Sequence, residues 1–460
     1  MFWPIALVFG IVSICAYPPE GPPPAAAQGA AAQVNPQNAK AIVEKLASFG
    51  TRHTLSETES EERGIGAARR WIKATLEEYA KAGAPGNGMR VELEEFDAPP
   101  SARLPEGAKV VNVVAVLPGT MPVEEGAVRR AYYVVAHYDS RNAEAMDAKG
   151  DAPGANDDAS GVAVVMECAR VLASRGALEQ TVVFLCTAGE EEGLIGAKYH
   201  AENVATAKPY MIGGVLNNDI VGDPSSSPDA EGKSRETRDR IRVFSEALPR
   251  TAGAAEYARL RATAAEGDSP SRQLARLVSD VAVWHDLPVK PTLIFRQDRF
   301  MRGGDHVAFN EAGFAAVRLT EVDEVYDRQH VGITEKDGKP YGDLPEFVDE
   351  EYLGNVVKLN VAAIVHLASA PSAPTEVRII TAELGNDTLL RWAPSPEPDI
   401  AGYEVVWRET TSPVWQHAQN VGNFTEARLP IGKDDVFFGV RAYDKDGFRS
   451  PVVFPGVARE

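Results

Sequence analysis

The sequence predicts an α/β protein: a mixed sheet flanked by helices, followed by a C-terminal all-β sandwich. Three observations indicate this fold class. Short, nearly continuous apolar strands alternate with helical segments over most of the chain, which is typical of a sheet covered on both faces. Polar side chains recur where these strands end. From Pro371 onward, short alternating strands separated by turn residues replace the earlier pattern.

The start of the chain has the features of an export signal. An apolar stretch that ends near Ala16 is followed by prolines and small residues, and it is too short to span a bilayer comfortably. We expect residues 1–24 to be a signal peptide, residues 25–37 a linker, and the protein to be secreted or periplasmic. Cys15 raises the alternative of a lipoprotein anchor, but Ile14 before it has the wrong size for a lipidation site. No later stretch has the length and apolarity of a membrane span.

The net charge restricts the possible partners, and the number of cysteines restricts how the fold is stabilised. The formal net charge of −19 argues against nucleic acid as a partner, because phosphate binding needs a basic face. The chain has 3 cysteines, and one of them lies in the predicted signal. A disulfide framework is therefore not expected to hold this protein together.

Residues 38–370 are predicted to form the larger domain. Helical spacing of apolar residues indicates helices within 38–82 and at 160–174, 269–286 and 350–370. Strands are expected at 90–96, 110–119, 131–140, 181–193, 211–223, 290–295 and 315–321. The polar segment 223–268 reads either as an insertion over the sheet edge or as a solvated loop.

Residues 371–460 are predicted to form the second domain. Trp392, Tyr403 and the closing run "FFGVRAYDKDGFRSP" resemble a fibronectin type III domain. Nothing in this segment suggests catalysis. We expect an accessory domain that binds a polymer or protein partner, or that protects the larger domain.

Side chains that bind metals or move protons follow the apolar strands of the larger domain. In an open α/β sheet the functional site lies beyond the carboxyl ends of the strands, so these side chains are expected to converge. An apolar strand that ends in an isolated carboxylate or imidazole has little structural reason to do so. The candidates are His137, Asp139, Asp157, Asp158, Glu190, Glu191, Glu192, Asp219, Asp305, His306 and His330.

The donor types in this set indicate zinc. Imidazole and carboxylate groups without a thiolate suit Zn²⁺, and other divalent ions are also compatible. A set of His, Asp, Glu, Asp and His is too large for one tetrahedral site that keeps an open position. It suits two ions about 3.5–4 Å apart that share one bridging carboxylate and one water.

Two adjacent carboxylates, Asp157 and Asp158, precede the helix predicted at 160–174. An Asp at a helix N-cap explains one of them, but neighbouring like charges raise each other's pKa unless a cation lies close by. Two metal ions would resolve this conflict. One Asp would bridge them, and its neighbour would turn away to bond the backbone.

The motifs "HYDS", "GANDDASG", "EEEGLIG" and "NND" and a late "QH" together resemble the co-catalytic two-zinc aminopeptidases, the family of the secreted bacterial leucyl aminopeptidase. The resemblance spans about residues 40–370, and it implies the zinc exopeptidase fold, which glutamate carboxypeptidases and glutaminyl cyclases share. It implies that His137 and Asp219 bind one zinc ion, that Glu191 and His330 bind the other, and that Asp157 bridges both.

The same resemblance implies roles for the remaining candidates. Glu190 is the general base that takes a proton from the bridging water. The glycine after the three glutamates sets this register, and a slip by one residue would bring in Glu191 and Glu192 instead. Asp139 orients His137 from behind. Asp305 and His306 match a family pair near the site, and Arg302 is a candidate for holding a substrate carboxylate.

The predicted function is therefore a secreted zinc exopeptidase that removes N-terminal residues from peptides or proteins. A carboxypeptidase or dipeptidase of the same fold would need a cationic pocket, which the arginine-rich "FRQDRFMRGG" leaves open. A glutaminyl cyclase needs only one zinc ion, and the full five-ligand set argues against it. A non-catalytic binding protein is the remaining alternative, but such relatives have usually lost ligands, and none is missing here.

Overall fold

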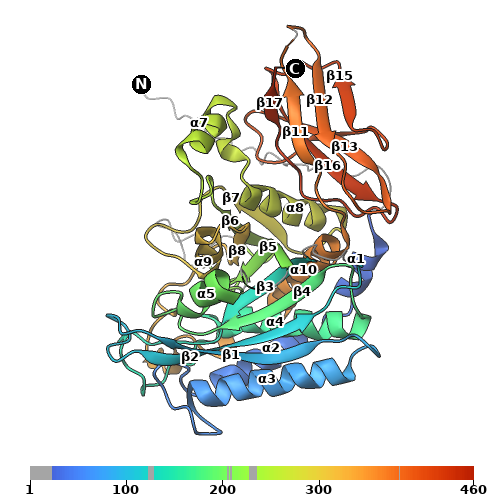
Figure 1. Cartoon of the computed structure of the whole chain (residues 1–460). Helices are drawn as coiled ribbons and strands as arrows, with labels where there is room; N and C mark the ends of the chain where they lie inside the picture. Colours follow the sequence, from blue (N-terminus) through green and yellow to red (C-terminus); the bar gives the residue numbers. More distant parts are fainter. Residues whose placement is uncertain are drawn as a thin grey trace, which may run out of the picture.

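The computed structural model of the chain describes residues 23–122, 129–204, 207, 210–226, 236–382 and 384–459. The predicted signal peptide lies almost entirely outside these residues. Figure 1 shows a large sheet with helices packed against it and two smaller sheets at the C-terminal end, as predicted. None of the helices in the described part of the chain has the length and apolarity needed to cross a membrane.

The large sheet has eight strands in the order β1-β2-β4-β3-β5-β8-β6-β7. Its central strands β4, β3, β5 and β8 run parallel. β1 and β2 pair antiparallel with their neighbours, and β6 is antiparallel to β8 but parallel to β7. The carboxyl ends of the four central strands therefore meet at one edge. The strands are β1 (Arg90–Ala98), β2 (Ala108–Leu117), β3 (Arg129–His137), β4 (Thr181–Thr187), β5 (Tyr210–Asn218), β6 (Arg240–Ser245), β7 (Lys290–Ile294) and β8 (Ala316–Thr320).

Helices cover both faces of this sheet. Alternate residues of the central strands, such as Val134 and Val135 of β3, belong to two separate apolar clusters, as expected of buried strands. One cluster packs under α2 (Pro36–Ala47), α3 (Gly64–Ala82), α4 (Ala159–Arg175), α8 (Pro270–Trp284) and α10 (Glu350–Ser369), and the other under α5 (Ile195–Tyr199) and α9 (Asp305–Glu311).

Shorter elements complete the larger domain. They are the helix α7 (Ala254–Ala262), the one-turn helical segments η1 (His200–Val204), η2 (Ala265–Gly267) and η3 (Pro345–Phe347), and the small hairpin of β9 (Thr334–Lys336) and β10 (Lys339–Tyr341).

Two segments differ from the prediction. The segment expected to be a linker, residues 25–37, contains the helix α1 (Ala25–Ala31) and the start of α2. Ala27, Ala30 and Ala31 are buried, and α1 packs against α10. Alanine has the highest helix propensity, so a small-residue run with a surface to cover becomes a helix rather than a linker. The segment 223–268, predicted as an insertion over the sheet edge or a solvated loop, instead contributes the strand β6 to the sheet itself.

The C-terminal segment forms a two-sheet sandwich with its own core. One sheet has the order β15-β12-β11-β17 and the other β14-β13-β16. Trp392 and Tyr403 face each other across this core, with ring centroids 5.6 Å apart. The strands are β11 (Thr375–Ile380), β12 (Thr388–Ala393), β13 (Ile400–Glu409), β14 (His417–Asn420), β15 (Glu426–Leu429), β16 (Val436–Asp444) and β17 (Gly456–Ala458).

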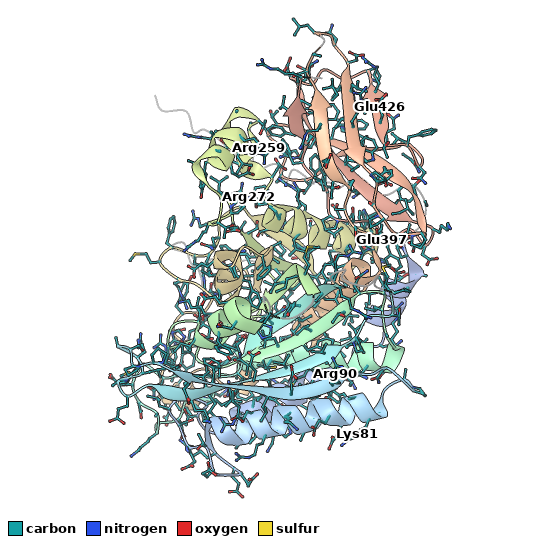
Figure 2. The ribbon with its side chains drawn as sticks, viewed as in Figure 1. Lys81, Arg90, Arg259, Arg272, Glu397 and Glu426 are labelled. Carbon is teal, nitrogen blue, oxygen red and sulfur yellow. The ribbon has the colours of Figure 1, made fainter. Side chains whose placement is uncertain are left out.

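The sandwich packs directly on the larger domain, beyond α8 and far from α3 (Figure 1). At this junction Asp268 accepts hydrogen bonds from Arg276 at 2.9 Å and from Arg408 of the sandwich at 2.8 Å. Nε1 of Trp415 donates to Gln273 of α8 at 3.1 Å. Figure 2 shows Arg272 on α8 and Glu397 at the foot of the sandwich. Buried polar contacts of this kind fix the two domains relative to each other.

Candidate metal centre

The predicted ligands come from five different positions in the chain and meet at the carboxyl edge of the central strands. His137 is the last residue of β3, and Asp219 directly follows β5. Asp157 lies just before α4, and Glu191 lies four residues after β4. His330 lies in the loop after β8. The sheet topology alone brings these residues together, because β4, β3, β5 and β8 are neighbours and parallel.

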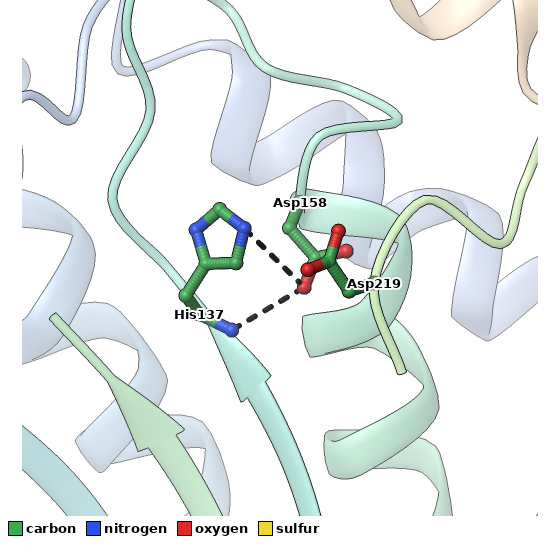
Figure 3. A group of neighbouring side chains, drawn as sticks. All are labelled: His137, Asp158 and Asp219. Atoms are coloured by element: carbon green, nitrogen blue, oxygen red, sulfur yellow. Dashed lines mark hydrogen bonds and ion pairs between the residues drawn. The ribbon is translucent and has the colours of Figure 1, made fainter. Parts of the chain in front are cut away.

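The first group of donors consists of His137, Asp158 and Asp219, drawn in Figure 3. One donor atom of each lies within 4.8 Å of the others. All three residues are buried. Nε2 of His137 also lies 3.2 Å from Oδ1 of Asp157, which adds a fourth donor to this group.

The second group consists of Asp157, Glu191 and His330. Nε2 of His330 lies 2.9 Å from Oδ2 of Asp157 and 2.9 Å from Oε1 of Glu191. Asp157 therefore turns one carboxylate oxygen toward each group. This is the geometry expected of a carboxylate that bridges two ions.

The donor atoms of the second group fit a metal ion. Oδ2 of Asp157 and Oε1 of Glu191 are buried and accept no hydrogen bond of good geometry, although Nε2 of His330 lies 2.9 Å from each of them. A buried carboxylate oxygen without a hydrogen-bond partner is costly unless a cation compensates it. The donor set of imidazole and carboxylate suits zinc, and together the two groups offer enough donors for a pair of zinc ions.

Asp157 and Asp158 differ in their surroundings although they are adjacent. The Asp158 carboxylate accepts from the backbone N–H groups of Gly161 at 3.0 Å, Ile220 at 3.2 Å and His137 at 3.3 Å. Burial raises the pKa of Asp158 well above the usual range, and Asp219 and Asp157 add to this. Burial acts in the same direction on Asp157, but His330 and His137 hold its pKa well below the usual range. Asp158 therefore accepts hydrogen bonds from the backbone, whereas Asp157 faces the rings of His137 and His330.

Glu190 is the predicted base and lies beside the donor groups. Desolvation raises the pKa of its carboxyl well above the usual range, and Glu191, Asp219 and Asp305 reinforce the shift. A carboxyl with a raised pKa is suited to accept a proton from water and return it.

Asp139 contacts both the turn that carries Glu190 and Glu191 and the ring of His137. Its carboxylate accepts from the backbone N–H groups of Glu190 at 3.3 Å and Glu191 at 3.1 Å. Its Oδ1 lies 3.5 Å from Nδ1 of His137, and its backbone oxygen lies 3.2 Å from the same nitrogen. Asp139 therefore fixes the turn that carries the glutamates and the ring of His137.

The other predicted site residues lie further out. Oδ2 of Asp305 accepts from Thr187, while buried His306 lies 2.9 Å from the backbone oxygen of Gln297. Burial lowers the pKa of His306 to about 4. Glu192 accepts from Thr54 at 2.5 Å and pairs with His53 at 3.3 Å. The structure therefore brings Glu191, and not Glu192, to His330.

Arg302 does not touch the donor groups directly. Its Nη1 lies 3.5 Å from Gln329, the residue before His330, and 3.6 Å from Glu324. Its side chain is 32% exposed.

Three arginines and one aspartate at the site escaped the sequence analysis. Arg52 is fully buried and donates to the backbone oxygens of Tyr138 at 2.7 Å and Gly154 at 2.9 Å. It thus joins the loop after β3 to the loop before α4. Asp343 accepts hydrogen bonds from the backbone N–H groups of Asn156 and Asp157. Arg318 forms an ion pair with Asp219. Arg141 contacts Glu191 and His330. Only Arg141 had a local signal, because it follows "HYDS" directly.

Comparisons with known proteins show the family of this chain. A sequence model of peptidase family M28 matches residues 112–340. A probable zinc metalloprotease of Leptosphaeria maculans is 42% identical over 423 residues, which cover 92% of this chain and 95% of the relative. A protein of the same name from Pyricularia oryzae is 41% identical over 94% of this chain and 85% of its own. Both relatives are fungal proteins.

A comparison of structures agrees on the fold. The crystal structure of LapA from Legionella pneumophila superimposes with a TM-score of 0.50 at 19% identity, over 75% of this chain and 76% of that one. This likeness shows a shared fold and no more. The identity to the fungal relatives over almost the whole chain carries the assignment, and this chain belongs to peptidase family M28.

Proposed function

We propose that this chain is a zinc-dependent exopeptidase that removes N-terminal residues from peptides. The observation that carries the proposal is the orientation of Asp157, whose Oδ1 faces His137 at 3.2 Å and whose Oδ2 faces His330 at 2.9 Å. Two fungal relatives that bear the name probable zinc metalloprotease support the choice of metal. His137, Asp219 and Asp157 would hold one ion, and Asp157, Glu191 and His330 the other.

The residues around the donor groups perform the proton transfers. Bound zinc would polarise the scissile carbonyl and lower the pKa of a shared water. Glu190 accepts the proton of the attacking water and delivers it to the leaving amine. Asp139 holds Glu190 at the correct distance through the backbone N–H bonds of its turn. Thr187 at the end of β4 donates to Asp305 of α9, which ties this end of β4 to α9.

Charge around the site favours substrate N-termini over C-termini. A substrate carboxylate needs a cation without an acidic partner, whereas an α-ammonium group is attracted by carboxylates. Arg318 pairs with Asp219 at 2.8 Å, Arg141 pairs with Glu191 at 2.8 Å, and Arg302 lies 3.6 Å from Glu324. These contacts support an aminopeptidase, and the net charge of −19 argues against nucleic acid as substrate.

The proposal is tested with zinc-loaded protein and matched peptides that carry a free or an acetylated N-terminus, with mass spectrometry of the products. Loss of N-terminal residues from the free peptides alone is the expected result. Trimming from the C-terminus would make the enzyme a carboxypeptidase, and loss of ammonia from N-terminal glutamine would make it a cyclase. A Glu190→Gln protein serves as the control for contaminating peptidases.

We further propose that the chain is exported and that its sandwich is a fibronectin type III-like accessory domain. Trp392 and Tyr403 in the shared core of two sheets support the second point. Sequencing the N-terminus of protein recovered from culture medium tests export, and cleavage close to residue 24 is expected.

A further inference from the structure

Arg141 lies directly behind two of the proposed ligands. Its Nε donates to Oε2 of Glu191 at 2.8 Å, and its Nη2 lies 2.6 Å from Nδ1 of His330. We propose that Arg141 makes the two metal positions unequal, so that the position at Glu191 and His330 binds zinc more weakly than the position at His137. This inference rests on the proposed function.

The direction of the hydrogen bonds at His330 supports the inference. Nε2 of His330 faces Asp157 and Glu191, so Nε2 is the nitrogen available to a metal. A neutral imidazole that binds metal through Nε2 carries its proton on Nδ1, and this N–H needs an acceptor. A guanidinium has five donors and no acceptor. The contact between Arg141 and Nδ1 therefore has to break when Nε2 binds zinc.

The position at His137 has the opposite arrangement. Nδ1 of His137 lies 3.2 Å from the backbone oxygen of Asp139, which is an acceptor suited to an N–H on that nitrogen. The ring is therefore already held in the tautomer that binds metal through Nε2. Metal binding at this position breaks no contact behind the histidine.

The charges behind the two positions also differ. Arg318 pairs with Asp219 at 2.8 Å, but a second carboxylate, that of Asp298, lies 3.2 Å from it and offsets its charge. Arg141 likewise pairs with a proposed ligand, Glu191, but among the described residues it has no second carboxylate within 4.0 Å to offset its charge. A cation entering the second position is thus repelled by a guanidinium and shares its carboxylate with it.

The test measures zinc binding rather than activity. Metal-free protein is dialysed against buffers of graded free zinc concentration, bound zinc is counted by mass spectrometry, and the melting temperature is followed in parallel. Arg141→Gln removes the charge and supplies an acceptor for Nδ1–H, Arg141→Met removes the charge only, and Arg141→Lys keeps it. Arg328→Gln is the matched control, because this arginine of the loop after β8 pairs with Asp223 instead of a proposed ligand.

We expect the wild type to bind two ions in two separated steps. Arg141→Gln tightens the weaker step by tenfold or more and changes the stronger step by less than threefold. Arg141→Met tightens it less, while Arg141→Lys and Arg328→Gln leave it unchanged.

The opposite results overturn the inference. A weaker step that stays unchanged or weakens in Arg141→Gln and Arg141→Met refutes it, and so does an equal shift of both steps. In either case two ions still bind, so the proposed function stands. A wild-type protein that binds no zinc overturns the proposed function and this inference together.

Discussion

Asp343→Asn tests how the loop before α4 positions Asp157, the proposed bridging carboxylate. Oδ1 of Asp343 accepts from the backbone N–H of Asn156 at 2.6 Å, and Oδ2 accepts from that of Asp157 at 2.9 Å. Asparagine has the same shape but only one acceptor oxygen, so one buried N–H then faces an amide NH₂ group. Leaving a buried donor unsatisfied costs about 1–3 kcal/mol. A shifted Asp157 lowers metal affinity by about 10–100-fold, the usual effect of losing a partner behind a ligand.

The assay measures the free energy of unfolding of metal-free protein and, separately, the zinc affinity. Both are measured at pH 8.5, because burial raises the pKa of Asp343 to about 7 and the carboxylate must be charged. Asp147→Asn is the control. This carboxylate also accepts hydrogen bonds from two backbone N–H groups, but it is partly exposed, so water can take over a hydrogen bond that the substitution removes. If Asp343→Asn matches this control in stability and zinc affinity, Asp343 does not position Asp157.

Three further predictions concern the base and the domain junction. Glu190→Gln lowers kcat by about 10²–10⁴-fold while KM and zinc content stay close to wild type, and a loss below fivefold would contradict its role as base. Burial lowers the pKa of His366 from 6.5 to about 3, so the folded state binds fewer protons between these values and the free energy of unfolding falls as the pH decreases from 6.5 to 3. Melting curves from pH 7 to 4 should show this loss, and His366→Gln, which keeps an acceptor for the Arg449 N–H, should flatten it. A chain that ends at Ser369 exposes the buried partners of the sandwich on α8 and should be insoluble or melt earlier, whereas a soluble protein with the wild-type melting temperature would show the sandwich to be dispensable.

The sheet and the polar strand ends were predictable from the sequence because both are local patterns. Apolar runs of the length of a buried strand predicted β3, β4, β5 and β8, and proposed ligands stand at the end of β3 and directly after β5. The rule that sites lie at the carboxyl ends of parallel strands then placed these residues together. The helix at Ala25–Ala31 was missed because its burial depends on α10, more than 300 residues later in the chain.

The residues that hold the ligands in place could not be predicted, because their partners are distant in sequence. Arg52 binds the backbone oxygens of Tyr138 and Gly154, which are 86 and 102 residues away. Every residue has a backbone oxygen, so the sequence does not show which of them accept a side-chain hydrogen bond. In the sequence, a buried arginine that donates to backbone oxygens therefore cannot be told from a surface arginine. Arg318 and Asp219 are separated by 99 residues, and only the pairing of β5 with β8 brings them together.

The adjacent carboxylates Asp157 and Asp158 combine both situations. The local sequence identifies two acidic donors before a helix, and it assigns the N-cap to one of them. The division of roles depends on distant segments: Ile220 offers its backbone N–H to Asp158, and His330 offers its ring to Asp157. Each carboxylate gains partners that the other cannot reach, so the repulsion between them is offset separately on each side. A motif therefore specifies which donors are present, and the tertiary structure specifies where each one points.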